Sequence, residues 1–223
     1  MVTELGTKAN PRTDRITING RPLPQAQQPV YILLHKPVGV VTTLSDPEGR
    51  PTVREVLPSV RARVFPVGRL DYASSGLLLL TNDGELALRA THPRYWFRKT
   101  YRVKVKGVPS PATLERMASG IRLDDGQHSG QADVRLLRAG DDKAWLEISL
   151  GEGRNREVRR ICEALGHSVE KLARVAMGPL TLGSLQPGDS RPLSAKELER
   201  LRLALGLVSR DLPDHSRDTR RRW

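Results

Sequence analysis

Short apolar runs, separated by turns rich in glycine, proline, asparagine and aspartate, recur along the chain. Compact apolar runs predict buried strands, and alternation of apolar with polar residues predicts half-buried strands. The segment 99–107 alternates in this way, with Tyr101, Val103 and Val105 on one face and basic side chains on the other. We predict strands over residues 30–34, 64–67, 76–81, 99–107, 134–137 and 144–150, and a short strand over 15–21 that ends in an Asn19-Gly20 turn.

Helical spacing and capping signals predict fewer helices than strands. Thr52 and either Asn82 or Asp83 are placed to cap helices, and Gly166 and Gly206 are placed to end them. We predict helices over residues 53–57, 85–91, 111–119, 156–165 and 194–205. Because the strands outnumber the helices and mostly neighbour one another in sequence, the pattern predicts an α+β domain with a largely antiparallel sheet.

The chain is strongly basic, with a net charge of +12 and an isoelectric point of about 10.5. Clustered cations indicate a polyanionic partner, although a merely soluble basic protein would share this composition. No acidic residue lies between Glu85 and Glu115, whereas aromatic residues are interleaved there with basic ones. Aromatic faces stack on the splayed bases of RNA, so this window favours RNA as the partner.

Several classes of protein are disfavoured. Cys162 is the only cysteine, which precludes an internal disulfide and indicates a reducing, cytoplasmic setting. The five histidines are scattered without ligand spacing, so we expect no metal site. There is no glycine-rich phosphate loop, secretory signal or membrane-spanning run, so we expect no nucleotide hydrolysis and no membrane association.

The segment Gly68-Arg69-Leu70-Asp71 stands just ahead of the apolar run at 77–80. It places a carboxylate on a loop at the edge of the core, with Arg69 as a nearby counter-charge. An acid in that environment can stay ionised and act as a nucleophile or base. Taken alone, Asp71 would suit a turn or a helix cap better than a catalytic role.

With Ser74-Ser75-Gly76-Leu77-Leu78 and Thr81-Asn82-Asp83-Gly84 behind it, this segment resembles the signature of ribosomal RNA pseudouridine synthases of the RsuA/RluB family. Lys36-Pro37-Val38-Gly39 resembles the first motif of that family. The run 153–160 resembles its late motif, and Lys171-Leu172-Ala173-Arg174-Val175 a further segment. Glu157 stands where the family usually has glutamine, and we expect it to face away from the catalytic aspartate.

The resemblance implies a pseudouridine synthase fold, with a mixed, mainly antiparallel β-sheet core flanked by helices and an active-site cleft between two subdomains. It implies that Asp71 is the essential catalytic residue, that Arg159 pairs with it, and that no cofactor or metal is needed. Tyr101 would stack on the target base and Leu172 would line the uracil pocket. Without the resemblance, Tyr101 would be a core residue and the arginines of 156–160 a solvated helix face. We expect RNA contacts from Lys36, Arg98, Lys99, Arg102, Lys104, Arg154, Arg156, Arg160 and Arg174.

The expected reaction is isomerisation of a uridine in ribosomal RNA, and the segments 46–53 and 64–68 look most like the RluB-type enzymes of large-subunit (23S) rRNA. We expect a monomer acting on that RNA or on an assembly intermediate of the large subunit. The resemblance also implies that residues 1–28 are the end of an N-terminal RNA-binding domain plus linker. Residues 29–206 would then form the catalytic domain and 207–223 a basic, disordered tail. A small-subunit target, an inactive RNA-binding or ribosome-assembly factor, and a DNA-binding regulator remain as alternatives.

Overall fold

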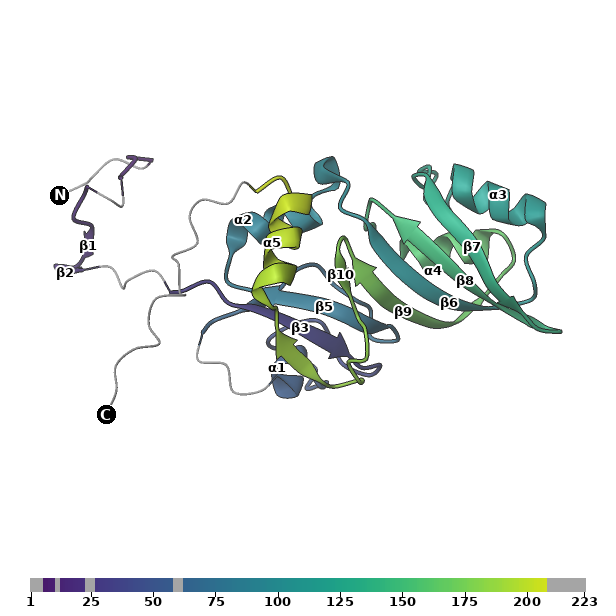
Figure 1. Ribbon diagram of the computed structural model, residues 1–223, viewed down its shortest axis with the longest axis horizontal. Coiled ribbons are helices and arrows are strands. Elements are labelled where there is room, and N and C mark those ends of the chain that lie inside the picture. The colour runs from purple at the N-terminus through teal and green to yellow at the C-terminus, as the bar shows by residue number, and fades with distance from the viewer. Residues whose placement is uncertain (1–5, 11–12, 23–26, 58–61, 208–223) are drawn as a thin grey trace.

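The computed structural model describes residues 6–10, 13–22, 27–57 and 62–207. Its centre is a nine-stranded sheet in the order β11-β3-β5-β9-β6-β8-β7, with β4 added beside β5 and β10 beside β9 (Figure 1). The strands are β3 (Tyr31–Lys36), β4 (Phe65–Pro66), β5 (Ser75–Thr81), β6 (Lys99–Lys106), β7 (Ala132–Ala139), β8 (Lys143–Leu150), β9 (Val169–Met177), β10 (Leu180–Thr181) and β11 (Ser190–Pro192). Among the described strands only β5 and β9 pair in parallel, so the sheet is mixed and mainly antiparallel, as expected.

The parallel pair joins two halves of the sheet through very few residues. Ser75 lies opposite Ala173, and Gly76 lies opposite Arg174. Gly76 has φ +113°, and a Cβ at this position would lie 2.2 Å from the carbonyl oxygen of Arg174. Only glycine combines that backbone angle with so close an approach. The junction between the halves therefore depends on one residue without a side chain.

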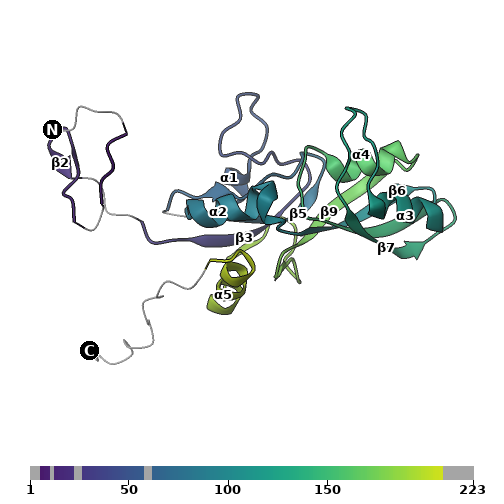
Figure 2. The ribbon, with the colours of Figure 1, turned by 90° about the horizontal axis from the view of Figure 1, so that it is seen from above.

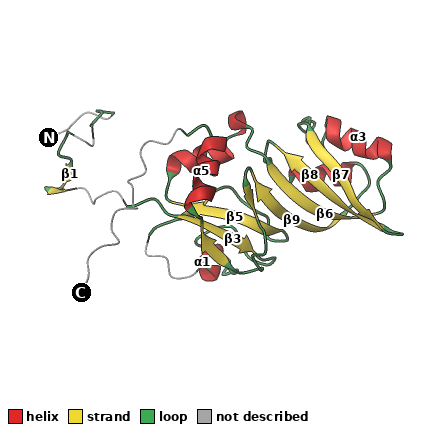
Figure 3. Cartoon of the chain, in the orientation of Figure 1, coloured by secondary structure: helices red, strands yellow, loops and turns green. Residues whose placement is uncertain are grey.

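Helices cover both halves. On the first half, α2 (Gly84–Thr91) and α5 (Ala195–Ala204) share an apolar cluster with Leu33, Leu77 and Leu79. The alternate side chains of the same strands pack with α1 (Val53–Val56) on the other face. On the second half, α3 (Pro111–Ser119) and α4 (Glu157–Ala164) share one apolar cluster with β6, β8 and β9. Figure 3 shows α3 beside the outer strand β7. Seen from above, α4 and α5 lie on opposite sides of the sheet (Figure 2). A 3₁₀ turn (Pro93–Tyr95) precedes β6.

The α+β class and most predicted elements are confirmed, with boundaries within two residues of the structure. At the start of the chain the predicted Asn19-Gly20 turn is confirmed, but the residues on its two sides pair as a small hairpin, β1 (Thr17–Ile18) and β2 (Arg21–Pro22), where one strand had been predicted. Asn19 and Gly20 have φ +51° and +76°, the left-handed pair that a tight hairpin turn requires. Strands β9, β10 and β11 had not been predicted. Strand β9 carries the charged residues Glu170 and Lys171, and its pairing with β6 has two register irregularities. Strands β10 and β11 are only two and three residues long.

The expected domain boundaries remain predictions. Of the proposed tail 207–223, residues 208–223 lie outside the described residues. Within the part of the chain that is described, no helix has the length and apolar character needed to cross a membrane.

Candidate active site

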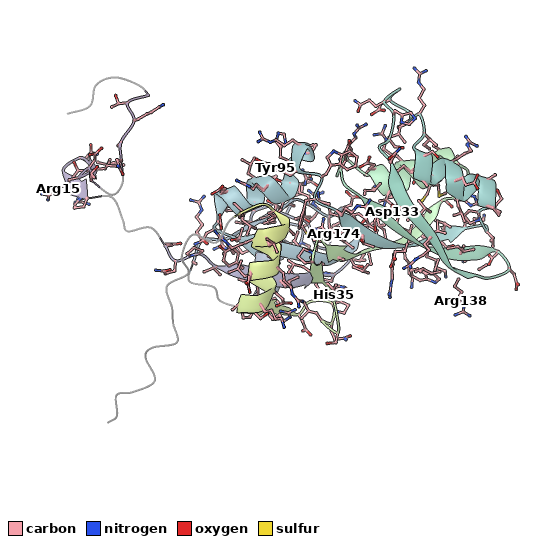
Figure 4. All side chains as sticks on the ribbon, turned by 45° about the horizontal axis from the view of Figure 1, so that its top comes forward. Arg15, His35, Tyr95, Asp133, Arg138 and Arg174 are labelled. Carbon is pink, nitrogen blue, oxygen red and sulfur yellow. The ribbon has the colours of Figure 1, made fainter. Side chains whose placement is uncertain are left out.

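A cavity of about 360 Å³ lies where the two halves of the sheet meet. One wall is the loop 67–74, which leads from β4 to β5, and the opposite wall is the segment 153–158 at the start of α4. The floor comes from the central strands β6 and β9, which contribute Lys99, Tyr101, Leu172 and Arg174. Figure 4 shows Arg174 at this junction, with Asp133 and Arg138 on the outer half. The cavity thus occupies the predicted cleft between two subdomains.

The loop that carries Asp71 is held by hydrogen bonds to the segment after β3. The buried Thr42 hydroxyl donates to the Leu70 carbonyl at 2.7 Å and accepts from the Leu70 amide at 3.2 Å. The Gly39 amide donates to the Tyr72 carbonyl at 2.9 Å. Residues on both sides of Asp71 are therefore fixed, which orients its carboxylate toward the cavity.

Asp71 faces two arginines. Its Oδ2 lies 3.9 Å from Nε of Arg159 and 3.8 Å from Nη1 of Arg156. Arg159 is held by the backbone, since Nη2 donates to the Ala73 carbonyl at 3.0 Å and Nη1 to the Val169 carbonyl at 3.3 Å. Both ion-pair distances exceed those of direct hydrogen bonds. Neither arginine therefore occupies the carboxylate with a direct hydrogen bond, and the Asp71 oxygens remain free for a substrate.

Burial lowers the pKa of Arg159, and the neighbouring Arg156 lowers it further, whereas Asp71 raises it. A guanidinium starts from so high a pKa that it stays charged in spite of this. Nε of Arg159 is buried and has no hydrogen-bond partner among the described residues. The acceptor that this Nε faces is the Asp71 carboxylate, 3.9 Å away.

Arg69 does not supply the expected counter-charge. It is exposed and lines the cavity, but the ion pairs found for Asp71 in the described chain are those with Arg156 and Arg159. The cations that balance the carboxylate come from a segment 85 or more residues later in the chain. Proximity in sequence was a poor guide, because Arg69 and Asp71 both line the cavity and yet form no ion pair with each other among the described contacts.

Tyr101 and Leu172 both line the cavity, Tyr101 half-buried and Leu172 buried. Tyr101 also packs against the apolar cluster beneath α4, so it is both a core residue and part of the cavity floor. Their roles in stacking and in lining a base pocket remain predictions that this placement permits.

The structure corrects the expectation for Lys36. This side chain is fully buried, and its Nζ donates to the Pro37 carbonyl at 2.8 Å and to the Val40 carbonyl at 2.7 Å. Burial lowers the pKa of Lys36 to about 8, against the opposing effect of Asp71. Lys36 cannot reach a phosphate from there. It shapes the 36–40 turn, whose Gly39 holds the catalytic loop.

The other predicted RNA contacts fall into three groups. Lys99 and Arg174 are buried in the cavity floor rather than displayed on a surface. Arg154 and Arg156 lie at the cavity wall, with Arg154 held by Glu152 at 2.7 Å. The remaining four are not brought to the cavity. Arg102 and Lys104 project from the opposite face of β6, Arg98 pairs with Asp133, and Arg160 pairs with Asp124 and Asp125.

Glu157 is a second correction, because it lines the same cavity as Asp71 instead of facing away. It is buried, its Oε2 accepts from the Arg154 amide at 3.1 Å, and its Oε1 has no partner among the described residues. Burial raises the pKa of Glu157.

Thr42 is a further site residue that the sequence did not reveal, since nothing near it in the sequence distinguishes it from other threonines. In the described part of the chain, no group of three histidine, cysteine or acidic side chains could hold a metal ion.

Comparison with known proteins gives concordant matches. The sequence model of a family described as RNA pseudouridylate synthase matches residues 30–164. A Bacillus subtilis protein named ribosomal large subunit pseudouridine synthase B is 44% identical over 204 residues, which cover 91% of this chain and 82% of the relative. An Aquifex aeolicus protein named uncharacterized RNA pseudouridine synthase is 45% identical over 208 residues, covering 93% and 83%. A crystal structure described as pseudouridylate synthase aligns with a TM-score of 0.72 and 32% identity, over 81% of this chain and 76% of that one.

Proposed function

Because this chain belongs to the RNA pseudouridylate synthase family, we propose that it converts a specific uridine of large-subunit ribosomal RNA to pseudouridine, with Asp71 as the essential residue. The observation that carries the proposal is that the Asp71 carboxylate lines a cavity and that its Oδ2 lies 3.9 Å from Nε of Arg159. The choice of the large-subunit RNA rests on the name of the Bacillus relative. A small-subunit RNA is the alternative substrate.

The reaction is an isomerisation in which the bond from C1′ of the ribose to N1 of uracil breaks. The base then turns and bonds to C1′ through its C5, while C5 loses a proton and N1 gains one. Asp71 either attacks the sugar or the base, or removes a sugar proton. Arg159 and Arg156 balance the charge of this carboxylate and orient it, since both lie within 4 Å of its Oδ2.

The target uridine must leave its stack to enter the cavity, at a cost of a few kcal/mol. Stacking on Tyr101 and contact with Leu172 offset that cost. Arg69 and Arg156 are exposed at the cavity, where they can hold the flanking phosphates.

The test is Asp71→Asn, assayed by carbodiimide labelling and primer extension on large-subunit rRNA. We expect one new pseudouridine stop with the unmodified protein and none with the variant, while RNA affinity stays within a few-fold. Asp141→Asn, at an exposed hairpin tip, is the matched control and should leave the stop in place.

Substantial product from Asp71→Asn would refute the assignment of the catalytic residue. No stop on naked RNA or on immature subunits, with the unmodified protein and tight RNA binding, would instead indicate a binding or assembly factor. A stop on small-subunit RNA alone would keep the activity and change the substrate.

A further inference from the structure

Lys99 is a buried cation without a hydrogen-bond or ion-pair partner among the described residues. Only 7% of the residue is exposed, and among the described residues its ammonium group has no hydrogen bond or ion pair. Its nearest described ring is that of Phe97, with Nζ 5.9 Å from the centroid. Taking a cation out of water without a partner is unfavourable, so such a group is retained where something else supplies its acceptor.

Arg174 presents a second unused donor in the same cavity. Its Nε donates to the Leu77 carbonyl at 2.7 Å, which fixes the guanidinium. Its Nη2 is buried and has no hydrogen-bond partner within the described chain. Two buried cations therefore line one cavity, and among the described residues neither the Lys99 Nζ nor the Arg174 Nη2 has an acceptor.

Their position relative to Tyr101 indicates what they would bind. Lys99 lies two residues before Tyr101 on the same face of β6, a displacement of about 7 Å along a strand. Arg174 is the cross-strand neighbour of Tyr101 on β9. A base stacked on Tyr101 would thus have these two cations at its edges, whereas a phosphate of the backbone would lie nearer the open rim.

We propose that Lys99 and Arg174 bind the carbonyl oxygens of the target uracil and stabilise the negative charge on the base after its bond to the sugar breaks, an inference that rests on the proposed function. When the C1′–N1 bond breaks, its electron pair stays on the base and is delocalised onto O2 and O4. In the route where Asp71 attacks the sugar, its carboxylate forms an ester at C1′. C5 of the turned base then displaces Asp71 from C1′. The C5 proton leaves and N1 takes one up, so no charge or atom is left over.

The charges around Lys99 support a catalytic role over a structural one. It faces Arg174 from β9, Glu157 from α4, Arg154 and Arg156 from the adjoining loop, and Asp71 and Arg69 across the cavity. Burial and Arg174 lower the pKa of Lys99 to about 8, and Glu157 raises it. A lysine surrounded mainly by cations gains nothing for stability, whereas preorganised donors aimed at developing charge are among the largest contributions to catalysis.

The experiment compares Lys99→Met, Lys99→Arg and the surface control Lys196→Met on an RNA that the unmodified protein modifies. Single-turnover rates are measured by tritium release from RNA labelled at C5 of uridine, and dissociation constants by filter binding at several salt concentrations. We expect Lys99→Met to lower the rate about 10²–10³-fold, the loss typical of removing one such donor. The dissociation constant should change less than three-fold. Lys99→Arg should recover most of the rate, and Lys196→Met should match the unmodified protein.

Two further readouts separate this from a packing role. Lys99→Met should be at least as resistant to denaturant as the unmodified protein, since it removes an unpaired buried charge. The rate of the unmodified protein should fall above about pH 8 as Lys99 loses its proton, and that fall should move to higher pH in Lys99→Arg.

An unchanged rate in Lys99→Met would overturn the proposal. A normal rate with weaker binding and a shallower salt dependence would show a phosphate contact instead. If Lys99→Met does not fold, Lys99→Gln replaces it. A rate in Lys99→Gln close to that of the unmodified protein would also overturn the proposal. Absence of product with the unmodified protein would defeat the proposed function itself, and this inference with it.

Discussion

Replacement of Gly76 by alanine tests whether the two halves of the sheet depend on one close backbone approach. The added Cβ would lie 2.2 Å from the Arg174 carbonyl oxygen, 2.5 Å from its nitrogen and 2.9 Å from its carbonyl carbon. All three are backbone atoms of β9, so no side chain can rotate away to relieve the overlap. Strand β9 must move, or β5 must separate from it.

The cost has two parts. A non-glycine residue at φ +113° is strained by about 1–3 kcal/mol. Shifting the packed backbone costs about 1–3 kcal/mol more, by analogy with overpacked cores. The sum of about 2–6 kcal/mol is a large share of the 5–15 kcal/mol by which domains are typically stable. Because Arg174 pairs with Tyr101 across the cavity floor, the displacement should also lower turnover more than ten-fold under conditions where the variant remains folded.

Urea unfolding gives the free energy of unfolding, and the tritium-release assay gives turnover. Gly84→Ala is the matched control, because no atom lies within 4 Å of its Cβ position and its φ is not positive. Gly84 is the first residue of α2, where alanine should be neutral or slightly stabilising. If Gly76→Ala unfolds within 1 kcal/mol of the parent, the account of the junction given above is wrong.

Two other substitutions probe the segment that supports the catalytic loop. Thr42→Val removes the hydroxyl that hydrogen-bonds both the amide and the carbonyl of Leu70. The free energy of unfolding, measured in urea, should fall by about 1–3 kcal/mol, and turnover, measured by product mapping, should fall as well. A change in the free energy of unfolding below about 0.5 kcal/mol would contradict this. Lys36→Met tests a pH dependence. The pKa of Lys36 is about 8 in the folded chain and 10.5 in the unfolded chain. Between these two pH values Lys36 is therefore protonated in the unfolded chain and unprotonated in the folded chain. The free energy of unfolding therefore rises with pH in that range, by at most about 1.4 kcal/mol per unit for each such lysine. Lys99 has a similar shift, so Lys36→Met should reduce the slope measured by unfolding at pH 8–10 without abolishing it.

Much of the fold was predictable because its patterns are local. The apolar run in β5 and the alternation in β6 and β8 identify strands before any partner is known. Asp83 caps α2 by accepting from the Leu86 amide at 3.0 Å, as its position in the sequence suggested. Strand β9 escaped prediction because its pairing with both β5 and β6 is decided by tertiary contacts. Its sequence carries charges and irregular register where an isolated strand would alternate.

The sequence predicted which residues belong to the candidate site better than it predicted how they are arranged. The motifs indicated that Asp71, Arg159 and Tyr101 belong together, and the structure brings them to one cavity or its wall. The motifs gave no indication of which side chains are buried, because the sequence does not distinguish a basic residue on one face of a strand from one on the other. Lys99 and Arg102 belong to one strand, yet the first lies in the cavity and the second on the opposite, open face. Only the pairing of β6 with β9 and the position of α4 decide which face holds the site.

The order of strands also bears on how the chain acquires its structure during synthesis. The outer half, from β6 to β9, is one continuous stretch whose neighbours pair in near succession, which favours early and independent formation. The other half begins with β3 but is finished only when β11 and α5 arrive about 150 residues later. Until then β3 has an unpaired edge, and the apolar surface that later receives Leu201 and Leu205 is bare. β11 and α5 therefore close the half that carries Asp71, although they follow every other described element of that half in the chain.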